Sequence, residues 1–176
     1  EAPEPLQPRL QRVRAAAGRL QHVVAGLLAL FRSGVEVQRL PLDLPMLAAR
    51  LPVEGLRVQA LATATLDADA DLLTAALLNL VDNAIRHGAT TVTLSTPAAQ
   101  VLRVQDDGRG LPAGQRRALQ QALDAEDYAG RTGLGLMLAD LVARAHGGRL
   151  QLPEVAAGFA AELQLGPTRA ADTRRE

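Results

Sequence analysis

The sequence predicts an α/β sandwich in which helices cover one face of a single mixed sheet, with a long helix preceding the sheet domain. Helical stretches and strands suited to antiparallel pairing alternate irregularly from residue 37 to residue 167. Hydrophobic residues make up 48% of the 176-residue chain, which is enough to bury a core. Because aromatic residues make up only 2%, we expect that core to consist of Leu, Val and Ala.

The N-terminal part, residues 1–36, is predicted to be a leader followed by a long helix. Its apolar residues recur at alternating spacings of three and four, the heptad pattern of a packed helix: Leu10, Val13, Ala17, Leu20, Val24, Leu27 and Phe31. This seam must be buried, so it predicts self-association. The longest apolar run, residues 23–31, is too short to cross a bilayer, which needs about 20 apolar residues.

The sheet domain covers residues 37–167, and residues 168–176 are expected to form a tail. Alternating apolar and polar residues mark its strands, and Asp69 or Asp71 lies where a helix N-terminus favours a carboxylate. Gly147 and Gly148 would stop the last helix. The expected order is helix 45–51, strands 56–61 and 63–66, helix 70–86, strands 90–95 and 101–105, helix 113–125, a helix ending at 145, and strands 149–152 and 159–165.

Charge and cysteine content exclude several classes of partner and site. The formal net charge is zero, whereas a nucleic-acid binder normally has a basic excess, so we expect no nucleic-acid partner. The chain has no Cys, which excludes disulfides and thiolate metal sites and favours a reducing cytosol. The spacing of its His, Asp and Glu residues suggests no zinc site.

The helix 70–86 carries the first group of chemically active side chains. Asn79 and Asn83 are four residues apart, so both project from one face of a largely apolar helix. An amide oxygen suits Mg²⁺, and Arg86 lies close enough to reach a phosphate bound beside Asn83. The alternative is that both asparagines stabilise neighbouring loops, and the pair alone favours that alternative.

Two glycine-rich segments follow. In the first, Asp106 ends a strand and Gly108 and Gly110 follow it; a carboxylate there can accept a hydrogen bond from an amine such as that of adenine. An ordinary hairpin turn is the alternative. The second segment opens a helix with backbone amides that could hold phosphate, although a plain glycine-rich loop is the alternative; it contains Thr132, Gly133, Leu134 and Gly135. It is neither a Walker nor a Rossmann motif.

In this order, the three segments resemble the boxes of sensor histidine kinases. Residues 79–87 resemble the N box, residues 106–112 the first glycine box and residues 132–136 the second. Residues 146–149 are similar to the segment that closes the following helix. The resemblance covers residues 72–165 and implies the Bergerat fold shared by histidine kinases, gyrase, Hsp90-like chaperones and MutL proteins.

The resemblance also implies a function and partners. The chain would be the ATP-binding catalytic domain of a two-component sensor histidine kinase, transferring the γ-phosphoryl group of ATP to a histidine on a dimerisation helix missing from this chain. The helix within residues 1–36 resembles the second dimerisation helix, which implies a homodimer. A response regulator would receive the phosphoryl group. The domain would be cytoplasmic and would reach the membrane only through segments absent from this chain.

The family implies a role for each site residue. Asn83 would bind Mg²⁺, Asn79 would lie beside the phosphates, and Asp106 would bind the adenine amino group. Arg86 and His87 would line the nucleotide, together with Gly108, Gly110, Thr132 and Leu134; Gly133 and Gly135 would let the backbone fold over the phosphates. Gyrase and chaperone relatives have a glutamate in place of Asn79 and use it to activate water. Because Asn cannot act as a general base, phosphoryl transfer is favoured over hydrolysis.

The sequence departs from the family pattern in two places, and both bear on the implied kinase function. Residues 117–128 contain Leu119, Leu123 and Tyr128 but no Phe, so the phenylalanine box is missing and the lid is short or degenerate. No histidine is followed by an acidic residue, so we expect the fragment not to phosphorylate itself. His22 is interpreted as a solvated or packing residue, and His146 as a helix C-terminal residue favoured by the dipole.

Two other functions remain open. A serine kinase of the anti-sigma-factor type shares the three boxes. A degenerate domain that only docks a partner would be compatible with the short lid.

Overall fold

The computed structural model describes residues 37–51, 55–61, 65–128 and 134–167. The predicted heptad helix with His22, the C-terminal tail, and Thr132 and Gly133 lie outside these ranges. The described elements are β1 (Leu40–Leu42), α2 (Leu44–Ala49), β2 (Arg57–Leu61), β3 (Leu66–Ala68), α3 (Ala70–Arg86), β4 (Thr91–Ala98), β5 (Val101–Asp106), α4 (Ala113–Asp124), α5 (Leu134–Ala145), β6 (Arg149–Gln151) and β7 (Ala160–Gln164).

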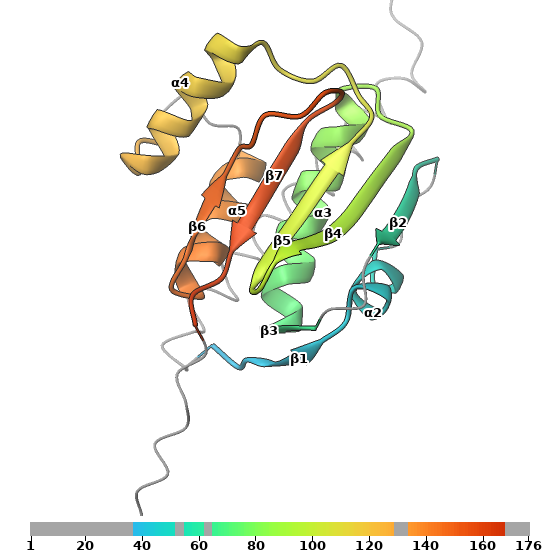
Figure 1. Ribbon diagram of the computed structural model, residues 1–176, viewed down its shortest axis with the longest axis vertical. Coiled ribbons are helices and arrows are strands. Elements are labelled where there is room, and N and C mark those ends of the chain that lie inside the picture. Colours follow the sequence, from blue (N-terminus) through green and yellow to red (C-terminus); the bar gives the residue numbers. More distant parts are fainter. Residues whose placement is uncertain (1–36, 52–54, 62–64, 129–133, 168–176) are drawn as a thin grey trace, which may run out of the picture.

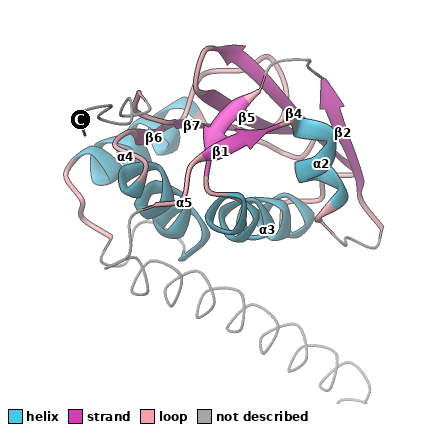
Figure 2. Ribbon diagram, turned by 90° about the horizontal axis from the view of Figure 1, so that it is seen from below, coloured by secondary structure: helices cyan, strands magenta, loops and turns pink. Residues whose placement is uncertain are grey.

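The fold is a two-layer sandwich, as the sequence predicts. A five-stranded sheet has the order β2-β4-β5-β7-β6, with β2 and β4 parallel and the other pairs antiparallel. Helices α3 and α5 lie side by side against one face of this sheet (Figures 1 and 2). Among the described helices, none is long and apolar enough to cross a membrane.

The strands alternate between the two faces of the sheet. Val92, Leu94, Leu102 and Val104 point into the core and are buried, because they share the face that the helices cover. Residues between them, such as Thr93, stay partly exposed on the other face. Every buried hydrophobic residue in the described ranges is Leu, Val or Ala, so the expected core composition is confirmed.

Helix α3 has the predicted bounds because its start signal is strong. The Asp69 side chain accepts hydrogen bonds from the N–H groups of Asp71 and Leu72, so it is the N-cap. At the other end His87 is the C-cap, and Gly88 follows with a φ of +80°. The buried face of the helix includes Leu73, Leu77 and Ala84.

The predicted strand at residues 63–66 is wrong in its bounds. The strand β3 begins at Leu66 and ends at Ala68, and it pairs with β1 in a separate two-stranded sheet. Leu66 and Ala68 are buried, whereas Asp67 between them is partly exposed, as expected of a strand with one covered face. The strand β1 itself was not predicted as a strand, because it has only three residues and contains Pro41.

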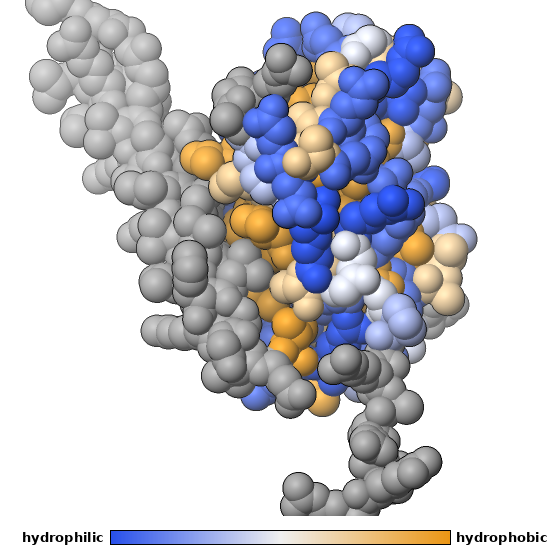
Figure 3. All heavy atoms as spheres, turned by 90° about the vertical axis from the view of Figure 1, so that its left-hand side faces the viewer, coloured by the Kyte–Doolittle hydropathy of each residue, from blue (hydrophilic) through white to orange (hydrophobic). Residues whose placement is uncertain are grey.

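Helix α4 is the polar helix that the sequence predicts, ending one residue earlier, at Asp124. It lies at one side of the sandwich, beyond α5 and β6 (Figure 1). That side of the molecule is largely hydrophilic, with apolar areas between the polar ones (Figure 3). Within α4 only Ala122 and Leu123 are buried, so the buried apolar contacts of the helix lie near its C-terminal end.

Candidate functional site

The two asparagines lie on α3 with different surroundings. Asn79 is 8% exposed, and its side-chain amide nitrogen donates a 2.8 Å hydrogen bond to the carbonyl of Ala75, one turn earlier. Asn83 is half-buried one turn later. The bond of Asn79 stays within its own helix, so Asn79 does not stabilise a neighbouring loop through this contact.

Arg86 and His87 lie at the exposed C-terminal end of α3. The Arg86 guanidinium forms a 3.0 Å ion pair with Asp82, four residues earlier. An exposed pair of this kind contributes less than about 1 kcal/mol, so it can be exchanged for a phosphate contact at little cost. The His87 side chain is exposed, and its backbone N–H donates to the carbonyl of Asn83.

Asp106 is the buried carboxylate of the first glycine-rich segment. It ends β5 and is 8% exposed. Its Oδ1 accepts hydrogen bonds from the N–H groups of Gly108, at 2.8 Å, and Phe159, at 3.2 Å. Both donors are backbone groups, so the carboxylate is held in one orientation at the end of the strand.

The neighbouring Asp107 has a structural role that the sequence did not reveal. Its Oδ1 accepts the N–H groups of Thr90 at 2.7 Å and Thr91 at 2.9 Å, and its Oδ2 accepts the Thr90 hydroxyl at 2.7 Å. The Thr90 hydroxyl and these N–H groups lower the pKa of Asp107 to about 2. Asp107 therefore connects the end of β5 to the start of β4, and the adjacent threonines are its sequence signal.

The glycines let two segments approach α3 closely. A Cβ on Gly108 would lie 3.1 Å from the carbonyl oxygen of His87, and a Cβ on Gly135 would lie 3.2 Å from that of Asn79. The Arg109 N–H also donates to the His87 carbonyl at 3.3 Å. The described parts of both glycine-rich segments therefore contact the half of α3 that carries the asparagines. In these contacts the glycines admit protein backbone, where the sequence suggested a ligand.

Leu134 begins α5 immediately after the residues that the structure leaves undescribed. Its side chain is 59% exposed. Its position beside Gly135 is that expected of the second glycine box, and its contact with nucleotide stays a prediction.

A buried polar cluster that sequence reasoning missed joins α5 to the segment after α4. Asp140 is 0% exposed and accepts hydrogen bonds from the Tyr128 hydroxyl at 2.7 Å, Arg144 Nε at 2.7 Å and the Leu150 N–H at 2.9 Å. Burial, and next the hydrogen bond to Asp140, raise the pKa of Tyr128 to about 12. Only the spacing of Asp140 and Arg144 could have been a signal in the sequence.

His146 follows α5 as predicted, but the dipole explanation is wrong. The residue is 0% exposed; its Nε2 accepts the N–H of Asp69 at 3.0 Å, and its Nδ1 lies 2.7 Å from the Val142 carbonyl. These partners fix the neutral ring with its proton on Nδ1. Burial is the largest effect on His146, and it lowers the pKa of the ring. The buried ring is neutral, so it has no positive charge that could interact favourably with the dipole of α5.

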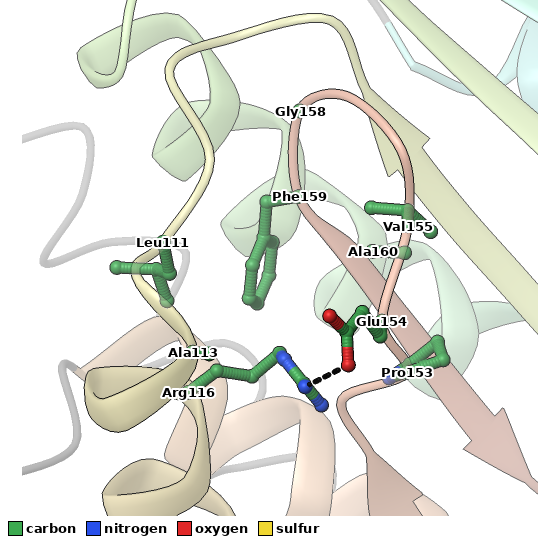
Figure 4. Close-up of a pocket in the computed structure, with 9 residues that line it drawn as sticks. All are labelled: Leu111, Ala113, Arg116, Pro153, Glu154, Val155, Gly158, Phe159 and Ala160. Atoms are coloured by element: carbon green, nitrogen blue, oxygen red, sulfur yellow. Dashed lines mark hydrogen bonds and ion pairs between the residues drawn. The ribbon is translucent and has the colours of Figure 1, made fainter.

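Two cavities lie among the described residues; the larger is lined by Asp106, and neither is lined by Asn79 or Asn83. One of about 320 Å³ lies on the uncovered face of the sheet and is lined by Thr91, Thr93, Gln105 and their neighbours. The other, of about 80 Å³, lies between α4 and the connection from β6 to β7 (Figure 4). In the described ranges, no cluster of three His, Asp or Glu residues could hold a metal ion.

Comparison with known proteins agrees with this arrangement. Residues 68–169 match the family of histidine kinase-, DNA gyrase B- and HSP90-like ATPases. The chain is 39% identical over 92 residues to the sensor histidine kinase ZraS of Escherichia coli O157:H7, covering 49% of this chain and 20% of ZraS. It is 30% identical over 173 residues to the probable sensor histidine kinase TcrY of Mycobacterium tuberculosis, covering 84% of this chain and 36% of TcrY.

A solved structure supports the same assignment. The crystal structure of the ATP-binding domain of PrrB from Mycobacterium tuberculosis matches with a TM-score of 0.57 and 27% identity, covering 74% of this chain and 99% of that one. The chain spans only about a fifth to a third of the lengths of ZraS and TcrY. It belongs to the histidine kinase-, gyrase- and HSP90-like ATPase family, as an ATP-binding catalytic domain of the two-component sensor histidine kinase type.

Proposed function

We propose that this domain binds Mg·ATP and, in the whole protein, transfers the γ-phosphoryl group to a histidine on a dimerisation helix that this chain lacks. The observation that carries the proposal is the convergence of both glycine-rich segments on the asparagine-bearing half of α3. The known relatives quoted above are sensor histidine kinases, which favours this proposal over a serine kinase.

Asp106 is the proposed adenine ligand. Its carboxylate is nearly buried at a strand end, and two backbone N–H groups orient it. A carboxylate only accepts hydrogen bonds, so it selects a ligand that presents an N–H group there. The exocyclic amine of adenine has this chemistry.

Asn83 is the proposed Mg²⁺ ligand. The metal prefers oxygen ligands and usually keeps several waters and phosphate oxygens, so one protein amide suffices. The half-buried Asn83 and the lack of a carboxylate cluster in the described ranges fit this mode of binding. The bound metal would supply charge neutralisation at the phosphates.

The residues of α3 would act by position and charge rather than by proton transfer. Asn79 would lie beside the phosphates, and neither its amide nor that of Asn83 can remove a proton from water. Arg86 would leave Asp82 to contact a phosphate, and His87, Gly108, Gly110, Thr132, Gly133, Leu134 and Gly135 would complete the nucleotide site. This arrangement would hold the γ-phosphoryl group for an in-line attack from another segment.

The three histidines of the chain bear on whether it can phosphorylate itself. We propose that the chain alone binds nucleotide but does not phosphorylate itself, since its histidines lack the phosphoacceptor pattern. The whole protein would be a homodimer through the helix in residues 1–36 and would pass its phosphoryl group to a response regulator. This chain would be part of the cytoplasmic portion of a membrane-bound sensor. Residues 37–167 would form the catalytic unit and residues 168–176 a tail.

Calorimetric titration of the chain with ATP, with and without Mg²⁺, tests the proposal. We expect binding that Mg²⁺ strengthens, a loss of at least about tenfold in affinity for Asp106→Asn, and loss of the Mg²⁺ effect for Asn83→Ala. Asp124→Asn, on the exposed end of α4, is the matched control and should bind like the wild type. If Asp106→Asn and Asp124→Asn bind ATP equally well, the adenine assignment is wrong.

Incubation with radiolabelled ATP tests the second part of the proposal. We expect no label on the chain itself. Acid-labile label on His22 would overturn the claim that the fragment cannot phosphorylate itself.

A further inference from the structure

The connection between β6 and β7 packs its last two residues against Asp106. The Phe159 N–H donates to Asp106 Oδ1 at 3.2 Å, and the Asp106 N–H donates to the Phe159 carbonyl at 2.9 Å. Among the described residues, the hydrogen bonds to this carboxylate reach Oδ1, from Phe159 and Gly108. The other oxygen, Oδ2, is therefore the one left to face a ligand.

Gly158 is required by the same contact. Its φ is +72°, and a Cβ there would lie 1.7 Å from the Asp106 carbonyl oxygen. Gly110 approaches from the other side, where a Cβ would lie 2.4 Å from the Gly158 carbonyl oxygen. Three backbone segments thus meet at distances that no side chain permits, so a displacement of Gly158 moves the end of β5.

The other end of the connection, directly after β6, is attached to α4. Arg116 donates to the Leu152 carbonyl at 3.0 Å and to Glu154 at 2.8 Å. In Figure 4 the Phe159 ring points between Leu111 and Arg116, beside the small cavity. The connection between β6 and β7 is therefore held at both ends. The ring of Phe159 packs beside the cavity, and this role is separate from that of its N–H group.

We infer that Gly158 and the Phe159 N–H group are positioning elements for the adenine carboxylate: they orient Asp106 so that Oδ2 accepts the exocyclic amine. This inference rests on the proposed role of Asp106. It assigns a part in base selection to a turn about 50 residues away from that aspartate in the chain.

The test compares the affinity for ATP with that for purine riboside triphosphate, which lacks the exocyclic amine. We expect the wild type to prefer ATP by at least about tenfold and Asp106→Asn to lose that preference. Gly158→Ala should lose it as well. Because Gly158→Ala could disrupt folding, a second variant made by ligating a synthetic C-terminal segment replaces only the Phe159 N–H with an ester oxygen, and it should also lose most of the preference.

Two control variants separate positioning from general stability. Phe159→Ala retains the N–H group and removes the ring, so it should unfold at a lower temperature yet keep the preference for ATP. Glu154→Gln changes the exposed end of the same connection and should keep both properties.

A folded ester variant with the wild-type preference for ATP would overturn the inference while leaving the role of Asp106 intact. The inference would also be overturned if Phe159→Ala lost the preference for ATP and the ester variant kept it, because the effect would then come from the ring. A wild type without any preference would instead remove the role of Asp106 itself, and the inference with it.

Discussion

Replacement of Asp140 by Asn should destabilise the fold strongly, although the two side chains have the same shape. Asp140 is fully buried and accepts hydrogen bonds from three donors, among them Arg144, whose side chain is 29% exposed. The asparagine NH₂ group would face at least one of these donors, and Arg144 would lose its buried carboxylate partner and keep only the exposed Glu126. Removal of one member of a buried pair costs about 3–5 kcal/mol, and the partial exposure of Arg144 favours the lower value, about 3 kcal/mol.

Urea unfolding followed by circular dichroism measures this change. A loss of about 3 kcal/mol corresponds to a fall of roughly 10 °C in melting temperature for a domain of this size. Tyr128→Phe removes one of the three hydrogen bonds and should cost about 1.5 kcal/mol. Because both changes affect one cluster, the double variant should lose less than the sum of the two. A loss below about 1 kcal/mol for Asp140→Asn would refute this reasoning.

Three further predictions concern single titrating or crowded groups. Tyr128 is the only tyrosine, so its ionisation can be followed by absorbance: it should occur near pH 12 in the folded protein and near 10 in urea, and its contribution to stability should be lost as the pH rises through that interval. Burial keeps His146 neutral, so stability should fall as the pH drops below about 6.5, where the unfolded chain takes up the proton first; urea midpoints should show a smaller fall in His146→Gln. Gly148→Ala places a Cβ 1.9 Å from the Gln164 carbonyl oxygen and should lower the melting temperature far more than Gly114→Ala, whose Cβ meets nothing within 4 Å.

The sequence was most informative where local signals are strong. Helix α3 was predicted with its observed bounds, because the Asp69 cap and the apolar period agree. The short strands β1 and β3 were missed or misplaced, since three residues carry too little periodicity and their pairing depends on tertiary contacts. Arg39, for example, donates to the carbonyl groups of His146 and Gly166, which are more than a hundred residues away in the chain.

In the candidate site, too, some features have a local sequence signal and others depend on tertiary contacts. The family motif selected Asp106 as the candidate adenine ligand, but nothing in the sequence assigned a role to Asp107, because only the fold buries Asp106 and connects Asp107 to β4. The Asp140 cluster was invisible for a similar reason. Its donors come from Tyr128, Arg144 and Leu150, which only the packing of α5 brings together.

The contact of Gly135 with Asn79 has a mechanical consequence. At that point the backbones of α3 and α5 approach without an intervening side chain, so any larger residue at position 135 would push the two helices apart. If the proposed phosphoryl transfer involves a domain motion, we expect α3 and α5 to move together, because a change in their spacing would break this contact.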